Sequence, residues 1–178
     1  YRIFGANDGS ADGMVFVMHQ DERGAGAIGN RGGGIGVYGN TEQTIKPAIA
    51  VEWDTFDNPM RLDVGQNNIH AVQVLPDASL VELGQTSGVE IRTSDDGDIV
   101  GRMWVEYNCG GSGRIDIWNT NTGSDFKPSF PLLTIPAENF EDIFFQDSNI
   151  LFVGYTSSIG GQADNHDIFG WEFVEGCN

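Results

Sequence analysis

The chain has 178 residues, and its 26 acidic and 9 basic side chains give a formal net charge of −17 at pH 7. This charge makes nucleic acids and anionic membrane surfaces poor partners, and no apolar run is long enough to insert into a membrane. An apolar content of 39% with 25 glycines indicates one domain of short strands joined by turns, long enough to bury a large core.

The two cysteines, Cys109 and Cys177, are too few for a disulfide framework. They follow two predicted strand ends, so one bridge would clamp the C-terminus in an oxidising compartment. Two unpaired thiols are the alternative, because the sequence does not fix the distance between them. No CxxC motif occurs, which excludes a thiol-rich metal site of that kind.

Apolar segments with alternating or β-branched residues predict a series of short strands. In chain order these segments are 1–4, 14–19, 48–51, 70–75, 79–83, 99–107, 114–118, 131–135, 149–156 and 167–175. The continuous apolar run at 149–156 predicts a strand buried on both faces, and Pro136–Ile143 predicts one helical turn. Ten or so strands at this spacing predict an all-β domain, a β-sandwich.

The segment 20–40 is rich in glycine and contains a formal GxGxxG at Gly24, Gly26 and Gly29. In a dinucleotide site this motif closes a strand and opens a helix. Further glycines follow here, so no helix can begin, and we reject a nucleotide site. The glycines instead let the backbone turn or approach another group closely.

The strand that opens at Ala48 runs into an acidic stretch. Glu52 and Asp54 lie two residues apart, so their carboxyl groups point to the same side of the strand. Two close carboxylates are costly to bury, unless one is protonated or a cation lies between them. We therefore predict a metal site formed by oxygen ligands: Glu52, Asp54, Asn58, Asp63 and the carbonyl of Phe56. His70 would add a nitrogen, which suits a transition metal, whereas oxygen ligands suit Ca²⁺. The alternative is a solvated cluster of acids.

Four blocks of the sequence resemble the L-type lectins, whose best known members are the legume seed lectins. They occur in the same order as in that family. The blocks are Ala11–Gly13 with the following strand, Gly32–Tyr38, Val51–Phe56 with Asn58, and the closing pair Phe152–Gly161 and His166–Phe173. Together they cover nearly the whole chain. The loops resemble those of bacterial members more than plant ones.

This resemblance implies a jelly-roll, concanavalin-like β-sandwich that binds sugars without catalysis. Asp12 would accept hydrogen bonds from sugar hydroxyls after a cis Ala11–Asp12 peptide, and Gly33 would donate its backbone N–H. Phe56 would pack on the sugar and Asn58 would contact both sugar and calcium. The variable loop 161–165 would select the sugar through Gln162, Ala163 and Asp164.

The resemblance also implies two ions. Phe56 and Asn58 would bind Ca²⁺, while Asp54 and Asp63 would bridge to a second ion, Mn²⁺ or another Ca²⁺, that Glu52 completes. The position at which the family carries a histidine ligand to the second ion corresponds to residue 68, which is asparagine here. His70 lies two residues further on the same face of the strand and would be the substitute.

Only eleven residues precede Asp12, whereas the family carries several strands there. Residues 1–178 are therefore expected to be one lectin domain of a longer protein, or to receive strands from another chain. The implied function is glycan or glycoprotein binding by a secreted or cell-surface protein, in adhesion or glycan capture. The alternatives are a jelly-roll glycoside hydrolase using Glu52 and Asp57, and a structural adhesin module without sugar binding.

Overall fold

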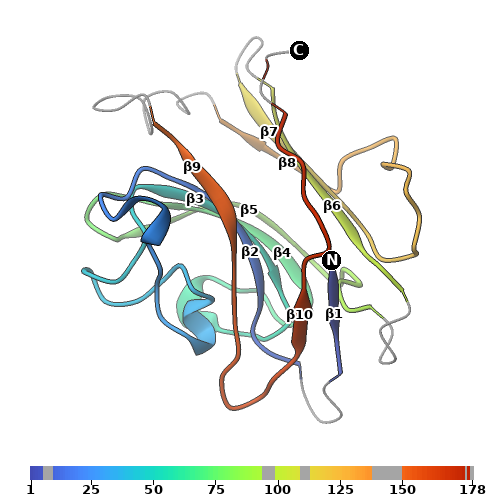
Figure 1. The fold of residues 1–178 in the computed structure, drawn as a ribbon, viewed down its shortest axis with the longest axis horizontal. Helices are drawn as coiled ribbons and strands as arrows, with labels where there is room; N and C mark the ends of the chain where they lie inside the picture. The colour runs from blue at the N-terminus through green and yellow to red at the C-terminus, as the bar shows by residue number, and fades with distance from the viewer. Residues whose placement is uncertain (6–9, 94–98, 109–112, 138–149, 175, 177–178) are drawn as a thin grey trace.

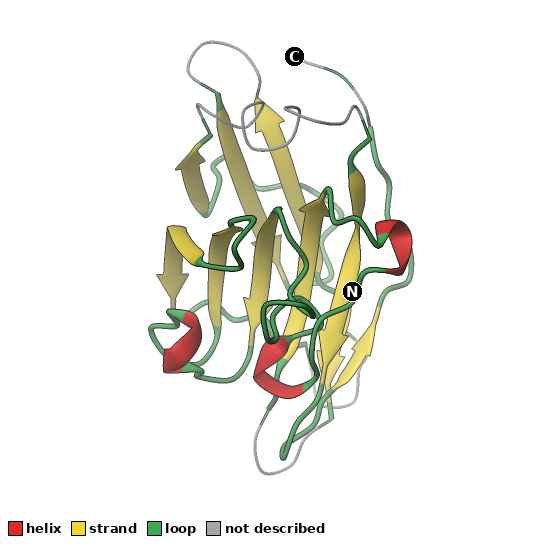
Figure 2. Cartoon of the chain, turned by 90° about the vertical axis from the view of Figure 1, so that its left-hand side faces the viewer, coloured by secondary structure: helices red, strands yellow, loops and turns green. Residues whose placement is uncertain are grey.

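The computed structural model describes residues 1–5, 10–93, 99–108, 113–137, 150–174 and 176. Within these residues the chain consists of strands joined by loops, and its helical elements are three 3₁₀ turns (Figure 2). The turns are η1 (Gly24–Gly26), η2 (Gly32–Gly34) and η3 (Pro59–Arg61). The strands are β1 (Arg2–Phe4), β2 (Gly13–His19), β3 (Ala48–Asp54), β4 (Asn68–Val74), β5 (Leu80–Ser87), β6 (Arg102–Asn108), β7 (Arg114–Thr120), β8 (Leu133–Pro136), β9 (Phe152–Ser158) and β10 (Asn165–Asp167).

The described strands form three antiparallel sheets. The largest has the order β5-β4-β3-β2-β9, and a second has the order β6-β7-β8. β1 and β10 pair side by side where the chain begins (Figure 1). The all-β prediction is confirmed, and no helix of the described residues is long and apolar enough to cross a membrane.

One face of the five-stranded sheet packs against the three-stranded sheet. Met14, Phe16 and Met18 of β2 share a buried cluster with Ile115 and Ile117 of β7. Burying each such side chain contributes about 1.5–3 kcal/mol relative to leaving it in water. These contacts hold the two sheets together as a β-sandwich.

The opposite face of the five-stranded sheet is also buried, because the 20–47 loop lies over it. Val15 and Val17 of β2 pack against Ile35, Val37 and Ile45 of this loop. The helical elements of this loop, all of whose residues are described, are the turns η1 and η2, and no α-helix follows the glycine motif, as the sequence predicts. Strands β2 and β3 therefore have a packed sandwich face and a packed loop face.

Two predictions near the C-terminus differ from the structure. β9 confirms a strand within the run 149–156, but its side chains are mostly half-buried and it lies at the edge of the sheet formed by the described strands, so the predicted burial on both faces is wrong. β10 ends at Asp167, and 168–174 is not in a strand although its residues alternate. The residues of β10 pair with β1, and this pairing ends at Asp167. The side chains that follow are largely in solvent, since Phe169 and Trp171 are 60% and 51% exposed. Alternation alone does not make a strand when the backbone has no ladder to join.

Cys109 and Cys177 lie outside the described residues, as does most of the predicted helical turn at 136–143. The hairpin joining β6 to β7 is confirmed by their register, which ends at the pair Asn108 and Arg114. Its turn residues are not described.

Candidate functional site

The acidic stretch begins at the end of β3, on the face covered by the loop. Ile49, Val51 and Trp53 point into the sandwich core, so Glu52 and Asp54 point to the other face, as alternation predicts. Both acidic side chains are fully buried. The strand thus delivers two carboxyl groups to a region that water does not reach.

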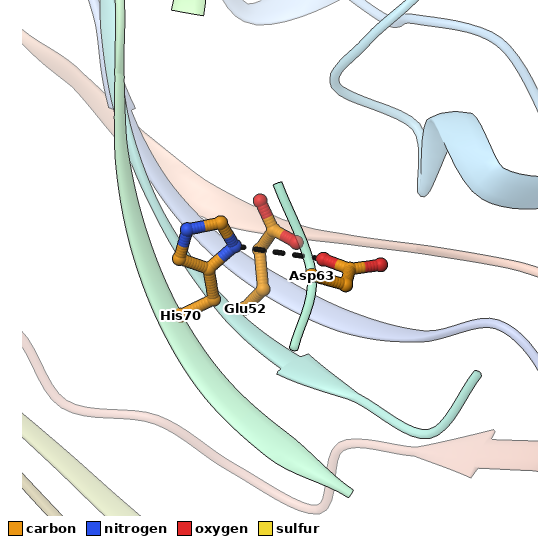
Figure 3. A group of neighbouring side chains, drawn as sticks. All are labelled: Glu52, Asp63 and His70. Carbon is orange, nitrogen blue, oxygen red and sulfur yellow. Dashed lines mark ion pairs between the residues drawn. The ribbon is translucent and has the colours of Figure 1, made fainter. Parts of the chain in front are cut away.

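Glu52 of β3, His70 of β4 and Asp63 of the loop between these strands converge (Figure 3). Each offers one ligand atom, and these atoms lie within 4.8 Å of one another. Glu52 and His70 are direct neighbours in the register of β3 and β4, and His70 Nδ1 lies 3.6 Å from Asp63 Oδ1. The group combines carboxylate oxygens with an imidazole nitrogen, which is a donor set for a divalent cation.

Several polar atoms of this region are buried without a hydrogen-bond partner in the structure. They are Glu52 Oε2, Asp54 Oδ2, Asp63 Oδ1, Asn68 Oδ1 and both ring nitrogens of His70. An unsatisfied buried polar atom costs about 1–3 kcal/mol, and an unsatisfied charge costs more. Such a concentration of unpartnered polar atoms fits bound cations, which would coordinate the oxygens and one of the two imidazole nitrogens.

The pKa values of these groups reflect the same crowding. Burial raises the pKa of Glu52 to about 7, although His70 and the hydroxyl of Tyr38 oppose the shift. Burial also raises the pKa of Asp54, and repulsion from Asp63 and Glu52 adds to it. Burial lowers the pKa of His70, but the Asp63 and Glu52 carboxyl groups outweigh it, and the net shift is upward. Without a cation the site therefore favours protonated carboxyl groups.

The loop after β3 is folded around the same carboxylates. Asp54 Oδ1 accepts the Phe56 N–H at 2.7 Å, and Asp63 Oδ2 accepts the Asn58 N–H at 2.7 Å. The Asn58 side chain donates to the Phe56 carbonyl at 3.3 Å. Asp63 is thus shared between the loop backbone and His70.

His70 and Asn68 both point into the buried region. His70 belongs to the converging group, whereas Asn68 donates its side-chain N–H to the Gly65 carbonyl at 2.7 Å. The asparagine oxygen is buried without a partner. His70 is therefore within reach of the carboxylates that the resemblance assigns to the second ion.

A second cluster of polar groups lies beside the first and contains Asp12. The Ala11–Asp12 peptide is cis, as the resemblance implies. Asp12 is 4% exposed, and its Oδ2 has no hydrogen-bond partner. Burial raises the pKa of Asp12, and a hydrogen bond with the Asn58 side chain offsets part of that shift. Asp12 Oδ2 therefore has an unused capacity to accept a hydrogen bond.

Gly33 approaches the same group closely. A Cβ placed on Gly33 would lie 2.4 Å from Asn58 Oδ1, so the glycine is required by contact rather than by backbone angle. The neighbouring Gly32 carbonyl accepts the Ser158 hydroxyl at 2.6 Å, and the Ser158 carbonyl accepts the Asp12 N–H at 3.0 Å. Three distant segments are thereby joined around Asp12.

The 161–165 loop divides into exposed and buried parts. Gln162 and Ala163 are exposed. Asp164 instead turns inward, where it accepts the Ser10 hydroxyl and lies 3.6 Å from Arg92. Asp164 was predicted only through its place in this loop.

Sequence reasoning did not find Tyr38, Ser10 or Arg92 as site residues. The buried Tyr38 hydroxyl donates to Glu52 Oε1, and the Arg61 guanidinium lies over the Tyr38 ring at 5.3 Å. Tyr38 closes the block Gly32–Tyr38, but no local pattern shows that its hydroxyl meets an acid on β3. Such contacts depend on the tertiary fold alone.

The alternative of a glycoside hydrolase does not match the geometry. It needs Glu52 and Asp57 on one strand. β3 ends at Asp54, and Asp57 is exposed on the following loop. The two carboxyl groups therefore do not form a pair on a common strand face.

The model of the legume lectin domain matches residues 2–177. This chain belongs to the legume lectin domain family. The family is a non-catalytic one that binds carbohydrates, and it accounts for the order of the four blocks along this lectin domain.

Curated relatives of the lectin domain include three receptor kinases of Arabidopsis thaliana. L-type lectin-domain containing receptor kinases VIII.2, VIII.1 and IV.1 are 29%, 27% and 27% identical over 90%, 90% and 92% of this chain. The chain spans about a fifth to a quarter of their lengths, 20%, 20% and 24%. These relatives are plant proteins and give no support to the expected bacterial origin.

A solved structure, that of peanut lectin with a nine-residue peptide, superposes on the lectin domain with a TM-score of 0.55. The match covers 92% of this chain and 62% of the peanut lectin chain at 19% identity. This likeness shows the legume lectin fold, a concanavalin-like β-sandwich, as predicted.

Proposed function

We propose that this lectin domain, residues 1–178, binds glycans in a calcium-dependent manner and carries out no chemistry on them. The observation that carries the proposal is the Asp12 carboxylate, which is buried beside Asn58 and Gly33 and has an acceptor oxygen without a partner. Sugar hydroxyls are donors of the required kind, and their hydrogen bonds to a carboxylate are charge-assisted.

The sugar would rest between polar groups and one aromatic ring. Asp12 accepts from hydroxyls, Asn58 contacts the sugar with its amide, and Gly33 offers its backbone N–H. The half-buried Phe56 ring packs on the C–H face of the sugar. Gln162, Ala163 and Asp164 lie on the loop that would set which sugar fits, and only the first two are exposed.

The ions would be held by the loop after β3. The proposed calcium ligands are oxygen donors: Asp54, Asn58, Asp63 and the carbonyl of Phe56. A second divalent ion, Mn²⁺ or Ca²⁺, would lie at Glu52, Asp54, Asp63 and His70, and the unpartnered oxygens and ring nitrogens support both sets. When bound, the ions supply positive charge that neutralises the carboxylates and fixes the loop next to Asp12.

The biological setting that we propose is a secreted or cell-surface protein that captures glycans or glycoproteins, as in adhesion. Shallow sugar sites bind weakly, so useful affinity would come from several sites acting together. The relatives named as receptor kinases join such a domain to a kinase. We propose that this lectin domain is likewise part of a longer protein.

A glycan array run with Ca²⁺ and again with a chelator tests the proposal. Asp12→Asn keeps the size of the side chain and removes its charge, and should abolish the calcium-dependent signal. Asp57→Asn makes the same change on an exposed residue and should leave the signal intact. Absence of any glycan signal in the calcium-loaded wild type would refute sugar binding and favour a purely structural module.

A further inference from the structure

Asp164 differs from the rest of its loop in the direction of its side chain. The Asp164 side chain is fully buried, whereas Gln162 and Ala163 are exposed. Its carboxylate accepts the Ser10 hydroxyl and lies 3.6 Å from the Arg92 guanidinium. Asp164 Oδ1 accepts no hydrogen bond but lies beside the Arg92 guanidinium, and the side chain is closed to solvent, unlike its neighbours Gln162 and Ala163.

The backbone near Asp164 is tied to the Asp12 segment as well. The Asp164 N–H donates to the Ala11 carbonyl at 3.1 Å, next to the cis peptide. At the other side of the turn, a Cβ on Gly160 would lie 3.2 Å from Asp12 Oδ2. The Gly160 N–H donates to the Gln162 carbonyl at 3.1 Å, which closes the turn. The loop is therefore hydrogen-bonded to the Asp12 segment through Asp164, and at Gly160 it passes close to the Asp12 carboxylate.

We propose that Asp164 is a positioning residue, whose contacts with Arg92 and Ser10 hold the 159–163 loop against Asp12 and so set the range of sugars accepted. This inference rests on the proposed glycan binding. The exposed Gln162 and Ala163 then meet the sugar, and Asp164 acts through them. The assignment replaces a direct contact by Asp164 with an indirect role.

The charged contact is the component of this arrangement that one substitution can remove. Arg92 comes from the segment after β5 and its side chain is 24% exposed, so the pair is only partly screened by water. Asp164→Asn removes the charge but keeps the shape of the side chain and an oxygen for the Ser10 hydroxyl. The loop would then be held mainly by its backbone hydrogen bonds.

The test compares Asp164→Asn with Asp167→Asn, a matched loss of one aspartate charge. Asp167 pairs with Arg2 at 2.7 Å on β10, outside the loop. Hydrogen exchange without sugar should become about tenfold faster at 159–163 in Asp164→Asn and stay unchanged there in Asp167→Asn. On a glycan array in Ca²⁺, Asp164→Asn should lose about tenfold in affinity for the best ligand and bind a wider set of sugars.

Unchanged exchange and an unchanged glycan profile in Asp164→Asn would overturn the inference, as would equal changes in both variants. If Asp164→Asn fails to fold, Ser10→Ala removes the hydroxyl contact with a smaller perturbation, and its loop exchange decides in the same way. A wild type without glycan signal would refute the proposed function alone. The exchange measurement would still support or overturn the role of Asp164 in holding the loop.

Discussion

Glu52 and His70 face each other across neighbouring strands, and both side chains are completely buried. A buried carboxylate is stable only when it is protonated, paired or bound to a cation. Since Tyr38 already donates to Glu52 Oε1, the remaining oxygen and the imidazole share one small space with Asp63. Cation binding at this site should therefore change the free energy of unfolding as well as sugar binding.

We expect the metal-free lectin domain to lose stability as the pH rises. The folded pKa of Glu52, about 7, lies above the ordinary pKa of a glutamate, 4.5. The folded state therefore binds more protons, and this contribution is full below pH 4.5 and is lost as the pH rises through 7. The shift corresponds to about 3 kcal/mol. The raised pKa of His70 acts in the same direction.

Urea unfolding from pH 4.5 to 7.5 checks this, with one series in chelator and one in Ca²⁺ and Mn²⁺. The free energy of unfolding should fall with pH in chelator, and the ions should restore it at pH 7. At a concentration of 100 times the dissociation constant, one ion adds about 2.7 kcal/mol. Identical profiles in the two series would contradict a metal site at Glu52.

Tyr38→Phe should weaken binding of the second ion. The hydroxyl donates to Glu52 and orients it, and loss of such an outer contact lowers metal affinity about 10- to 100-fold. Calorimetric titration of chelator-treated protein with Mn²⁺ measures the change. Tyr155→Phe, on the edge strand β9, is the matched control and should titrate like the wild type.

Gly33→Ala should abolish glycan binding while the domain stays folded. The new Cβ would lie 2.4 Å from Asn58 Oδ1, so the Asn58 side chain must move away from its position beside Asp12. Gly26→Ala is the control, since no atom lies within 4 Å of its Cβ position. Array signal and melting temperature together check the prediction, which fails if Gly33→Ala binds glycans as the wild type does.

Asp21 should stabilise the domain in mild acid. Burial would raise its pKa, but hydrogen bonds from Arg23 and from the Lys46 N–H outweigh burial and lower the pKa to about 2. This contribution is full above pH 3.8 and is lost as the pH falls through 2; it corresponds to about 2 kcal/mol. Asp21→Asn should remove that part of the acid transition in urea unfolding between pH 2 and 5, and an unaltered transition would contradict it.

The sequence predicts best what depends on neighbours along the chain. β2 and β3 are predictable because their apolar residues are continuous, and the common face of Glu52 and Asp54 follows from strand alternation alone. The two-sided burial predicted for β9 and the strand predicted at 168–174 are wrong, because the sequence shows hydrophobicity but not which backbone lies alongside.

The candidate site divides in the same way. The acids of one stretch can be grouped from their spacing, whereas the contacts of Asp164 with Ser10 and of Tyr38 with Glu52 join distant segments. The sequence does not show which of positions 162–164 is buried, because all three belong to one short turn. Their burial differs because the Asp164 carboxylate faces Ser10 and Arg92, which come from other parts of the chain.

Trp53 lies between Glu52 and Asp54 on β3 but on the opposite face, and its indole N–H donates to Asn119 of β7 at 3.0 Å. An intrinsic fluorophore is thus built into the strand that carries two of the proposed ion ligands. The chain has four tryptophans, so the difference in emission between the wild type and Trp53→Phe isolates the contribution of Trp53, and a change in that difference on adding ions would follow ion loading without an attached label.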